Sequence, residues 1–457
     1  MELRSTAGGA RDDGTRDFRD GRILWRLGGL SSQNASITYP PLLAMRTALL
    51  ACLALSLPAS AGTIFVDASA IGLADGSSWA HAHTDLQAAL AAATAGDELW
   101  VAAGVYTPHA SDAAVSFVLK DGVALYGGFA GGEASREQRD WDANPTVLDG
   151  DLGQDDIVGS GLFWYSGWNI VTSNSGHVVR AENVGANTVL DGFHVEAGHT
   201  GPSGTVAGHE LMWGSGVYCV NASPVLRNLT FRHNESAWAN GGALYVQDGS
   251  PVIEDCHFLE NYAYLGDGGG LAIAGNSSPV VRRCEFARNV ADARYADAQG
   301  AGLYVATATP ITIEDCVFED NRTRHFDPTS HTSYGGGMAV WTNGAVVRRC
   351  VFRRNVAMYG GGLLTWGDTT VEDSIFEGNE AVEVGGAVAD KGGWGGGLMI
   401  NSFWGKQLHL VNSTVAYNSA QKYAGVHMGL SATGLIENSI VWCNSAANPE
   451  IASGWKS

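Results

Sequence analysis

Positive charge is scarce in this sequence. It has 27 Lys and Arg against 47 Asp and Glu, which gives a formal net charge of −20 at pH 7. Nucleic acids and anionic membrane surfaces attract basic patches, so this balance argues against both as partners. Charged residues of both signs make up only 16% of the chain and hydrophobic residues 45%. Disordered chains show the reverse pattern, so we expect a large buried core.

Catalytic and metal-binding motifs are also missing. The chain has no Gly-rich phosphate loop, no Gly-x-Ser-x-Gly nucleophile motif and no Cys-x-x-Cys pair. Asp267 stands alone and not in the repeat of a calcium β-roll. One polar group gathers near a long loop but lacks His-Glu-x-x-His spacing, namely His194, Glu196, His199, His209 and Glu210. We predict no metal and no cofactor.

Long hydrophobic runs are absent as well. The apolar segment Ala48 to Leu57 is too short to span a bilayer, and we predict no transmembrane span in the mature chain. It follows the basic segment Met45-Arg46-Thr47 and precedes Pro58-Ala59-Ser60-Ala61, which is the order found in a signal peptide. We therefore interpret 45–61 as a signal peptide that is cleaved between Ala61 and Gly62.

The segment before Met45 has no apolar period. We interpret residues 1–44 as disordered and as an over-extended gene start. An alternative to signal peptide cleavage is a lipoprotein box at Leu49-Leu50-Ala51-Cys52, although almost no apolar segment would precede Cys52.

Glycine is abundant, with 61 residues, and many glycines belong to an internal repeat. A Phe-x-x-Asn motif is followed by a Gly-rich turn that begins at Gly241, Gly268, Gly300, Gly335, Gly360 or Gly385. The repeated phenylalanines are Phe231, Phe258, Phe286, Phe318, Phe352 and Phe376. The repeated asparagines are Asn234, Asn261, Asn289, Asn321, Asn355 and Asn379, with weaker copies at Asn418 and Asn444.

The repeats have the period of β-strands. Side chains alternate from Val252 to Phe258, and residues 215–445 show no helical period. The shortest step between repeated asparagines, 24 residues, suits one coil of three short strands and three turns. We therefore predict an all-β fold, a single-stranded right-handed parallel β-helix. Because coils stack about 4.8 Å apart, Phe should lie on Phe and the Asn amides should form a ladder at a turn with left-handed backbone angles.

Four cysteines share one register. Cys256, Cys284, Cys316 and Cys350 each lie two residues before a repeat Phe, and Ser374, Ser413 and Ser439 take this place later. An exported chain can form disulfides. The shared register nevertheless favours a column of free, buried thiols, which pack as small hydrophobic groups.

Residues 62–180 differ from the repeats. Thr84-Asp85-Leu86-Gln87 reads as a capping box that begins a helix from Asp85 to Ala93. A solenoid needs its first coil covered, so we predict that this helix is an N-terminal cap. We assign 62–180 to the cap and first coils and 181–450 to the repeats. Residues 451–457 form a tail, and both a natural and a truncated end fit it.

The Phe-x-x-Asn and Gly-Gly-Ala-Leu motifs resemble the repeats of chlamydial polymorphic outer membrane proteins and, more widely, of the pectin-lyase-like superfamily. Asp75-Gly76-Ser77-Ser78-Trp79 and Tyr126-Gly127-Gly128-Phe129 are similar to the opening of such exported proteins. The resemblance covers roughly residues 63–445. It implies a location that is secreted or at the outer membrane surface of a Gram-negative bacterium. It implies no single activity, because the superfamily holds lyases, hydrolases and adhesins.

Acidic residues on the repeats suggest ion pairs more than catalysis. Asp255 and Asp315 share a register with Asp373, and Arg282, Arg283, Arg348 and Arg349 lie on the same strand. We interpret these charges as a ladder of pairs, and we name no catalytic residue.

Loops between each Asn and the next Gly-rich turn carry aromatic residues. They include Trp238, Tyr262, Tyr264, Tyr295, Tyr334, Tyr359 and Tyr423. Aromatic side chains in a line suit sugar rings or a protein partner. We predict an adhesin-like protein that binds carbohydrate or a protein through this edge. The alternative is a polysaccharide lyase or glycoside hydrolase.

Overall fold

The computed structural model describes residues 61–156, 173–201, 213–293, 296–325, 331–382, 392–401, 405–429, 431–446 and 455–456. These residues all belong to one compact unit, 59–457. Residues 1–44, the predicted signal peptide up to Ser60 and most of the tail lie outside the described residues.

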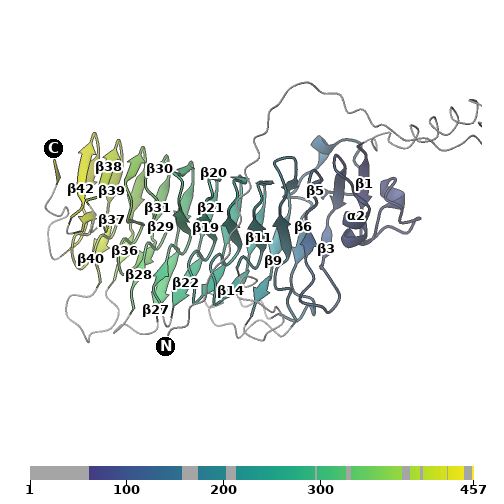
Figure 1. The fold of residues 1–457 in the computed structure, drawn as a ribbon, viewed down its shortest axis with the longest axis horizontal. Coiled ribbons are helices and arrows are strands. Elements are labelled where there is room, and N and C mark those ends of the chain that lie inside the picture. The colour runs from purple at the N-terminus through teal and green to yellow at the C-terminus, as the bar shows by residue number, and fades with distance from the viewer. Residues whose placement is uncertain are drawn as a thin grey trace, which may run out of the picture. The chain divides into compact units, whose positions relative to one another are not determined.

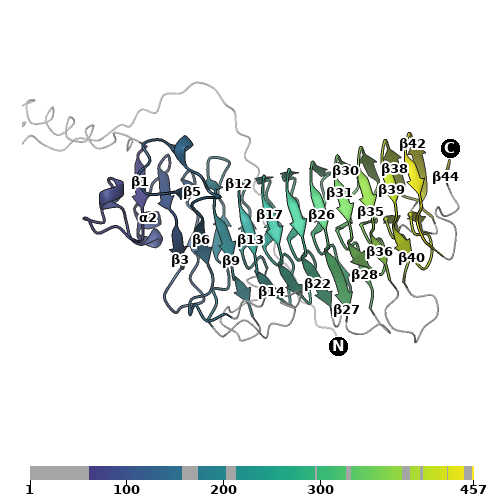
Figure 2. The same ribbon diagram turned by 180° about the vertical axis from the view of Figure 1, so that it is seen from behind.

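Nearly all of the strands stack coil upon coil in four parallel sheets (Figures 1 and 2). Every pairing between named strands in the described residues is parallel, and each long sheet joins equivalent strands of successive coils. The protein is therefore a parallel β-helix.

Sheet 1 and sheet 2 adjoin each other in every coil. Sheet 1 contains β1 (Thr63–Val66), β2 (Glu98–Ala102), β5 (Ala124–Phe129), β8 (Val189–Asp191), β12 (Val225–Arg227), β16 (Val252–Glu254), β20 (Val280–Arg282), β25 (Thr312–Glu314), β30 (Ala345–Arg348), β34 (Thr369–Glu372), β38 (Gln407–Val411), β42 (Thr433–Glu437) and β44 (Trp455–Lys456). Sheet 2 contains β3 (Gly104–Tyr106), β6 (Thr146–Asp149), β9 (His194–Glu196), β13 (Thr230–Arg232), β17 (His257–Leu259), β21 (Glu285–Ala287), β26 (Val317–Glu319), β31 (Val351–Arg353), β35 (Ile375–Glu377), β39 (Thr414–Ala416) and β43 (Ile440–Trp442).

Sheets 3 and 4 complete each coil. Sheet 3 contains β10 (His199–Thr200), β14 (Glu235–Ala237), β18 (Tyr262–Tyr264), β22 (Val290–Ala293), β27 (Arg322–His325), β32 (Val356–Ala357), β36 (Glu380–Ala381) and β40 (Ser419–Ala420). Sheet 4 contains β4 (Phe117–Val118), β7 (Val179–Glu182), β11 (Val217–Val220), β15 (Leu244–Gln247), β19 (Leu271–Gly275), β24 (Leu303–Thr307), β29 (Met338–Val340), β33 (Leu363–Thr365), β37 (Leu398–Ile400) and β41 (Val426–Met428). A small sheet pairs β23 (Ala298–Gln299) with β28 (Ser333–Tyr334).

The repeat coil has four short strands, not the three that we predicted. The segment from Val252 to Phe258, which alternates like one strand, is divided into β16 and β17 by Asp255. Asp255 has a left-handed φ of 55°, and this bend allows Ile253, Cys256 and Phe258 all to face the core. A change of alternation within the segment therefore marks a corner of the coil.

A phenylalanine stack and an asparagine ladder run through the core. Ring centroids of Phe258 and Phe286 lie 4.6 Å apart and nearly parallel, and the other repeat phenylalanines stack in the same way. Asn321 Nδ2 donates to Asn355 Oδ1 at 2.9 Å, and equivalent bonds link the amides from Asn234 to Asn444.

The backbone angles at the ladder correct our prediction. The ladder asparagines do not adopt positive φ. The residue before each one does, as Asp320 with φ 56° and Arg354 with φ 53° show. The asparagine amide is thus used for hydrogen bonding between coils, and its neighbour makes the turn.

The cysteine column is buried and free of disulfides. Cys219, Cys256, Cys284, Cys316 and Cys350 are buried free thiols, whereas Cys443 is free and exposed. The column continues through serines, because Cys350 N donates to Ser374 Oγ and Ser374 N donates to Ser413 Oγ.

The predicted helix is present as α2 (Leu86–Ala92), and two short 3-10 helices are η1 (Trp79–His81) and η2 (Arg136–Gln138). Asp85 is the N-cap residue of α2 and accepts from Gln87 N at 2.9 Å. Gln87 does not complete the predicted capping box, because its side chain donates to Pro108 O and Ser116 O. Leu86, Ala89 and Leu90 are buried in the main core. The role of α2 as a cap remains a prediction.

The Gly-rich turn of one repeat was assigned wrongly. The turn that follows Asn379 in register is Gly395-Gly396-Gly397, since Gly362 N donates to Gly397 O and β37 pairs with β33. Gly385, which we predicted, lies outside the described residues. The loop after Asn379 is therefore longer than it seemed from the sequence.

Candidate aromatic binding face

Two of the three acids predicted to lie in a charge ladder, Asp255 and Asp315, are held in ion pairs, whereas Asp373 makes none among the described residues. Arg283 makes two 2.7 Å bonds to the oxygens of Asp255, and Arg349 does the same to Asp315 at 2.7 and 2.8 Å. These guanidinium groups lower the pKa of both carboxyl groups.

Charge alternates from coil to coil in this ladder. The in-register row on sheet 1 reads Asp191, Arg227, Glu254, Arg282, Glu314, Arg348, Glu372. The alternation explains these acids as structural partners of arginine.

The outer face of sheet 4 is aromatic and apolar. On β33 the side chain of Leu363 enters the main core, whereas Leu364 joins a second cluster outside it with Ala339, Met399 and Trp366. Half-buried aromatic rings pack against this second cluster. We call the connected group of rings the aromatic strip; it contains Tyr334, Trp341, Tyr359, Trp366, Trp394, Tyr423 and His427.

Stacking holds the centre of the strip in place. The rings of Trp341 and Trp366 lie 4.0 Å apart with an interplanar angle of 10°. Trp341 Nε1 donates to Gln299 Oε1 at 2.7 Å. Trp341 is 42% exposed, whereas Trp366 is 8% exposed. Trp341 therefore presents a fixed ring to solvent.

The rest of the strip follows the coil register. Parallel bridges link Tyr334 to Tyr359, Tyr359 to Trp394 and Trp394 to Lys422. The ring centroids lie 5.4 Å apart for Tyr334 and Tyr359, and 5.7 Å apart for Tyr359 and Trp394. The Lys422 ammonium lies 5.5 Å from the centre of the Trp394 ring.

Several polar atoms of the strip have no partner among the described residues. They are Trp394 Nε1 and both ring nitrogens of His427, all of them buried. Burial lowers the pKa of His427 to about 4 and raises that of Tyr334 to about 12, so both are neutral at physiological pH. Burial also raises the pKa of Asp267, whose Oδ2 lies 3.5 Å from Gln299 Nε2. Because the nitrogens of Trp394 and His427 are shielded from solvent, the rings themselves are the surface that the strip offers, and aromatic rings suit stacking on sugar rings.

The residues that we predicted to bind a ligand do not all lie on one surface. Tyr334, Tyr359 and Tyr423 belong to the strip. Trp238, 47% exposed, and Tyr264 form a separate edge-to-face pair with centroids 6.5 Å apart. Tyr262 is only 4% exposed and donates to Asp292 Oδ2, so it offers no surface to a ligand. Tyr295 lies outside the described residues.

Sequence reasoning missed Trp341, Trp366, Trp394 and His427. A signal for two of them was available: Trp341 and Trp366 each come three residues after the first apolar residue that follows a Gly-rich turn. Both residues lie after the Gly-rich turns, whereas the predicted ligand residues lie in the loops before them.

Three residues of the polar group near His194 lie in the described part of the chain. His194 Nδ1 lies 3.2 Å from Glu196 Oε1, and His199 is buried with its pKa lowered to about 4 by burial. His209 and Glu210 lie outside the described residues.

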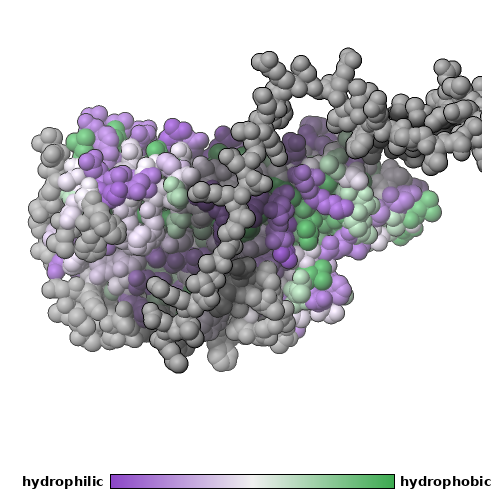
Figure 3. All heavy atoms as spheres, in the orientation of Figure 1, coloured by the Kyte–Doolittle hydropathy of each residue, from purple (hydrophilic) through white to green (hydrophobic). Residues whose placement is uncertain are grey.

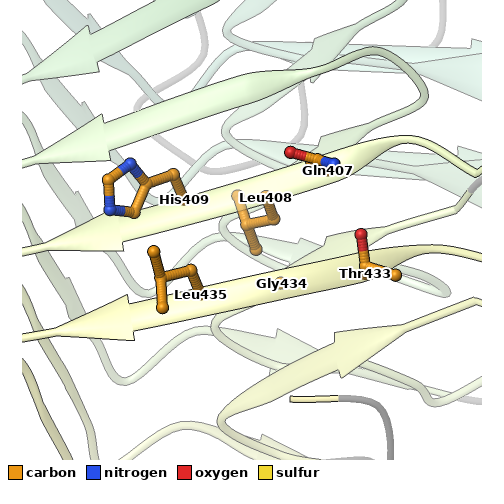
Figure 4. Close-up of a pocket in the computed structure, with 6 residues that line it drawn as sticks. All are labelled: Gln407, Leu408, His409, Thr433, Gly434 and Leu435. Carbon is orange, nitrogen blue, oxygen red and sulfur yellow. The ribbon is translucent and has the colours of Figure 1, made fainter. Parts of the chain in front are cut away.

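A hollow of about 270 Å³ lies between β38 and β42, where Gly434 has no side chain opposite Leu408 (Figure 4). Its titratable residue, His409, pairs with Glu437 Oε2 at 2.6 Å. On the face drawn in Figure 3, hydrophilic side chains cover much of the coil stack, and hydrophobic ones gather near β1 and α2. Neither feature forms a site with chemistry of its own.

Residues 168–381 match the family described as right handed beta helix region, so the parallel β-helix is right-handed. Pectate lyase Pel9A is similar in structure, with 13% identity, a TM-score of 0.37 and coverage of 86% of this chain and 79% of that chain. A polygalacturonase from Erwinia carotovora ssp. carotovora has 11% identity, a TM-score of 0.40 and coverage of 88% and 96%. PfbA, a surface adhesin of Streptococcus pneumoniae, has 10% identity, a TM-score of 0.35 and coverage of 79% and 88%.

These likenesses concern the fold alone. No curated protein matches the chain by sequence. Within the described ranges, no helix is long and apolar enough to cross a membrane.

Proposed function

We propose that this protein is an exported β-helix protein that binds carbohydrate on its aromatic strip. The observation that carries the proposal is Trp341, an exposed ring held by stacking on Trp366 and by a hydrogen bond to Gln299. A ring fixed before binding loses little entropy when a sugar stacks on it. The rings of Tyr334, Tyr359 and Trp394 extend the aromatic surface along successive coils.

Binding of oligosaccharides to the full-length protein tests this proposal. We expect Trp341→Ala to weaken binding at least about tenfold, because the variant loses the principal stacking surface. Calorimetric titration with neutral and acidic oligosaccharides measures the affinity.

The matched control is Trp442→Ala. Trp442 is 64% exposed on β43 of sheet 2, and its loss should leave the affinity unchanged. Equal weakening by both substitutions, or no binding of any sugar, would contradict the proposal.

We propose also that the chain is exported and cleaved after Ala61. Gly62 N donates to Asp97 Oδ1 at 2.9 Å, and Asp97 is 9% exposed. Cleavage would turn Gly62 N into an ammonium group that pairs with this carboxylate, which supports the predicted site. Intact mass of the protein recovered from an exporting bacterium tests it: a chain beginning at Gly62 is expected, and one that retains residues before it would count against export. The resemblance to polymorphic outer membrane protein repeats fits a surface location and remains an expectation.

The same preparations test the catalytic alternative. Incubation with uronic-acid polysaccharides would release unsaturated products if the protein were a lyase, and new reducing ends if it were a hydrolase. Our proposal predicts neither, because Asp255 and Asp315 are occupied by arginine.

A further inference from the structure

A cluster of carboxylates lies far from the aromatic strip in the sequence, in the segment that follows β6. Oxygens of Asp151, Asp155 and Asp156 all lie within 4.8 Å of one another. Calcium binds oxygen at about 2.3–2.6 Å, so a single calcium ion would be within reach of all three carboxylates. Sequence reasoning did not single out this segment.

In the described ranges, Asp149, Asp151 and Asp155 form no ion pair with Lys, Arg or His. Asp151 is only 6% exposed, and its two oxygens accept from the backbone N of Gly153 and of Asp156 at 3.1 and 2.9 Å. These bonds hold Asp151 beside the other carboxylates, and a cation that joined the group would offset the repulsion between like charges.

Asn174 supplies an independent sign of a ligand. It is 5% exposed, and a backbone bridge places it opposite Asp151. Its Nδ2 lies 2.8 Å from Asp156 Oδ2, which fixes the amide at the edge of the cluster. The other amide atom, Oδ1, is buried and finds no donor among the described residues. This buried amide oxygen without a donor is available as a further oxygen ligand for a cation.

Glu235 points to the same conclusion from the neighbouring coil. It is 6% exposed on β14, and its carboxyl group makes no hydrogen bond or ion pair in the described part of the chain, although its backbone N donates to Gly198 O. Its pKa is raised to about 8, chiefly by burial and then by the charge of Asp156. The negative potential of the cluster therefore extends to a buried group that has no partner.

We propose that Asp151, Asp155, Asp156 and Asn174 bind a calcium ion that ties the segment after β6 to the coil stack. All four residues offer oxygen ligands, which calcium prefers and which zinc and copper do not. The site shares no residue with the aromatic strip, so the calcium proposal does not depend on carbohydrate binding.

Thermal unfolding of the full-length protein, stripped of metal with a chelator, tests the site. We expect millimolar calcium to raise the unfolding midpoint by about 2 °C or more. Titration calorimetry should give a dissociation constant on the order of 10⁻⁴–10⁻³ M, as in extracellular calcium modules. Magnesium, which gives up its water reluctantly, should shift the midpoint less.

Asp155→Asn is the informative variant because Asp155 is exposed, so its substitution should leave the fold intact. It should lose most of the calcium response, as should Asp151→Asn. The control Asp142→Asn removes another exposed carboxylate of the same region and should keep the full response. The proposal would be overturned if the wild type showed no calcium shift, if Asp155→Asn responded like the wild type, or if magnesium were as effective as calcium.

Discussion

Each asparagine of the ladder is a buried polar group with every hydrogen-bonding atom in use. Asn321 Oδ1 accepts from the backbone N and the Nδ2 of Asn289, and its Nδ2 donates to Phe286 O and Asn355 Oδ1. Asn321→Ala would leave these partners buried and unsatisfied. We expect the free energy of unfolding to fall by at least about 3 kcal/mol, measured by urea denaturation.

The control for this residue is Asn343→Ala, at an exposed turn where Asn343 accepts one 3.3 Å bond. It should change the free energy of unfolding by under about 0.5 kcal/mol. Equal urea midpoints for Asn321→Ala and the wild type would show that the ladder is not a source of stability.

The cysteines should differ in their reactivity toward alkylating reagents because they differ in burial. Burial raises the pKa of the Cys219 thiol to about 12 and raises that of Cys284 as well, which suppresses the reactive thiolate. Alkylation of the native protein, followed by peptide mapping, should therefore label Cys443 and leave Cys256, Cys284, Cys316 and Cys350 unmodified. Labelling of the column at the rate seen in denaturant would contradict the buried stack.

At the scale of the element, charged side chains at equivalent positions of stacked coils are stable when their signs alternate from coil to coil. Arg283→Glu would place an acid between Asp255 and Asp315 in one column of turns. We expect a loss of about 1 kcal/mol at low salt, and a smaller loss in high salt, where screening is stronger. Arg283→Gln, which removes the pair without adding a like charge, should cost less.

The pH dependence of this pair has a definite sign. The Arg283 guanidinium lowers the folded-state pKa of Asp255, so the pair stabilises the fold above the unfolded-state pKa. That contribution disappears as pH falls through the folded-state pKa. The urea midpoints of the wild type and Arg283→Gln should therefore differ at neutral pH and converge in acid. If the midpoints still differed in strong acid, the effect of the substitution would come from packing and not from the ion pair.

For the whole molecule, the sequence predicted the features that recur at equivalent positions of successive coils. It did not predict features that depend on a single backbone angle or on an irregular loop. Phe258 and Asn261 recur in successive coils and lie on their equivalents, so the phenylalanine stack and the asparagine ladder follow from the spacing of the repeat. The corner at Asp255 divides a strand by a backbone angle, which composition does not reveal. Gly385 and Gly395 both begin plausible turns, and only the pairing of β37 with β33 decides between them.

The candidate site was predicted only in part for the same reason. The aromatic strip joins loop residues such as Tyr334 to strand-end residues such as Trp366, which the coil brings together from different parts of the repeat. The segment that we propose binds calcium lies before the Phe-x-x-Asn repeats. Its residues therefore do not recur at a fixed spacing, and the sequence gives no repeat pattern that would predict the site.

The central claim is that the aromatic strip binds carbohydrate. A crystal structure of the protein soaked with an oligosaccharide bound in the titrations tests it most directly. We predict a sugar ring stacked on the exposed face of Trp341. A sugar bound instead among the paired charges of sheets 1 and 2, with the strip empty, would contradict the account.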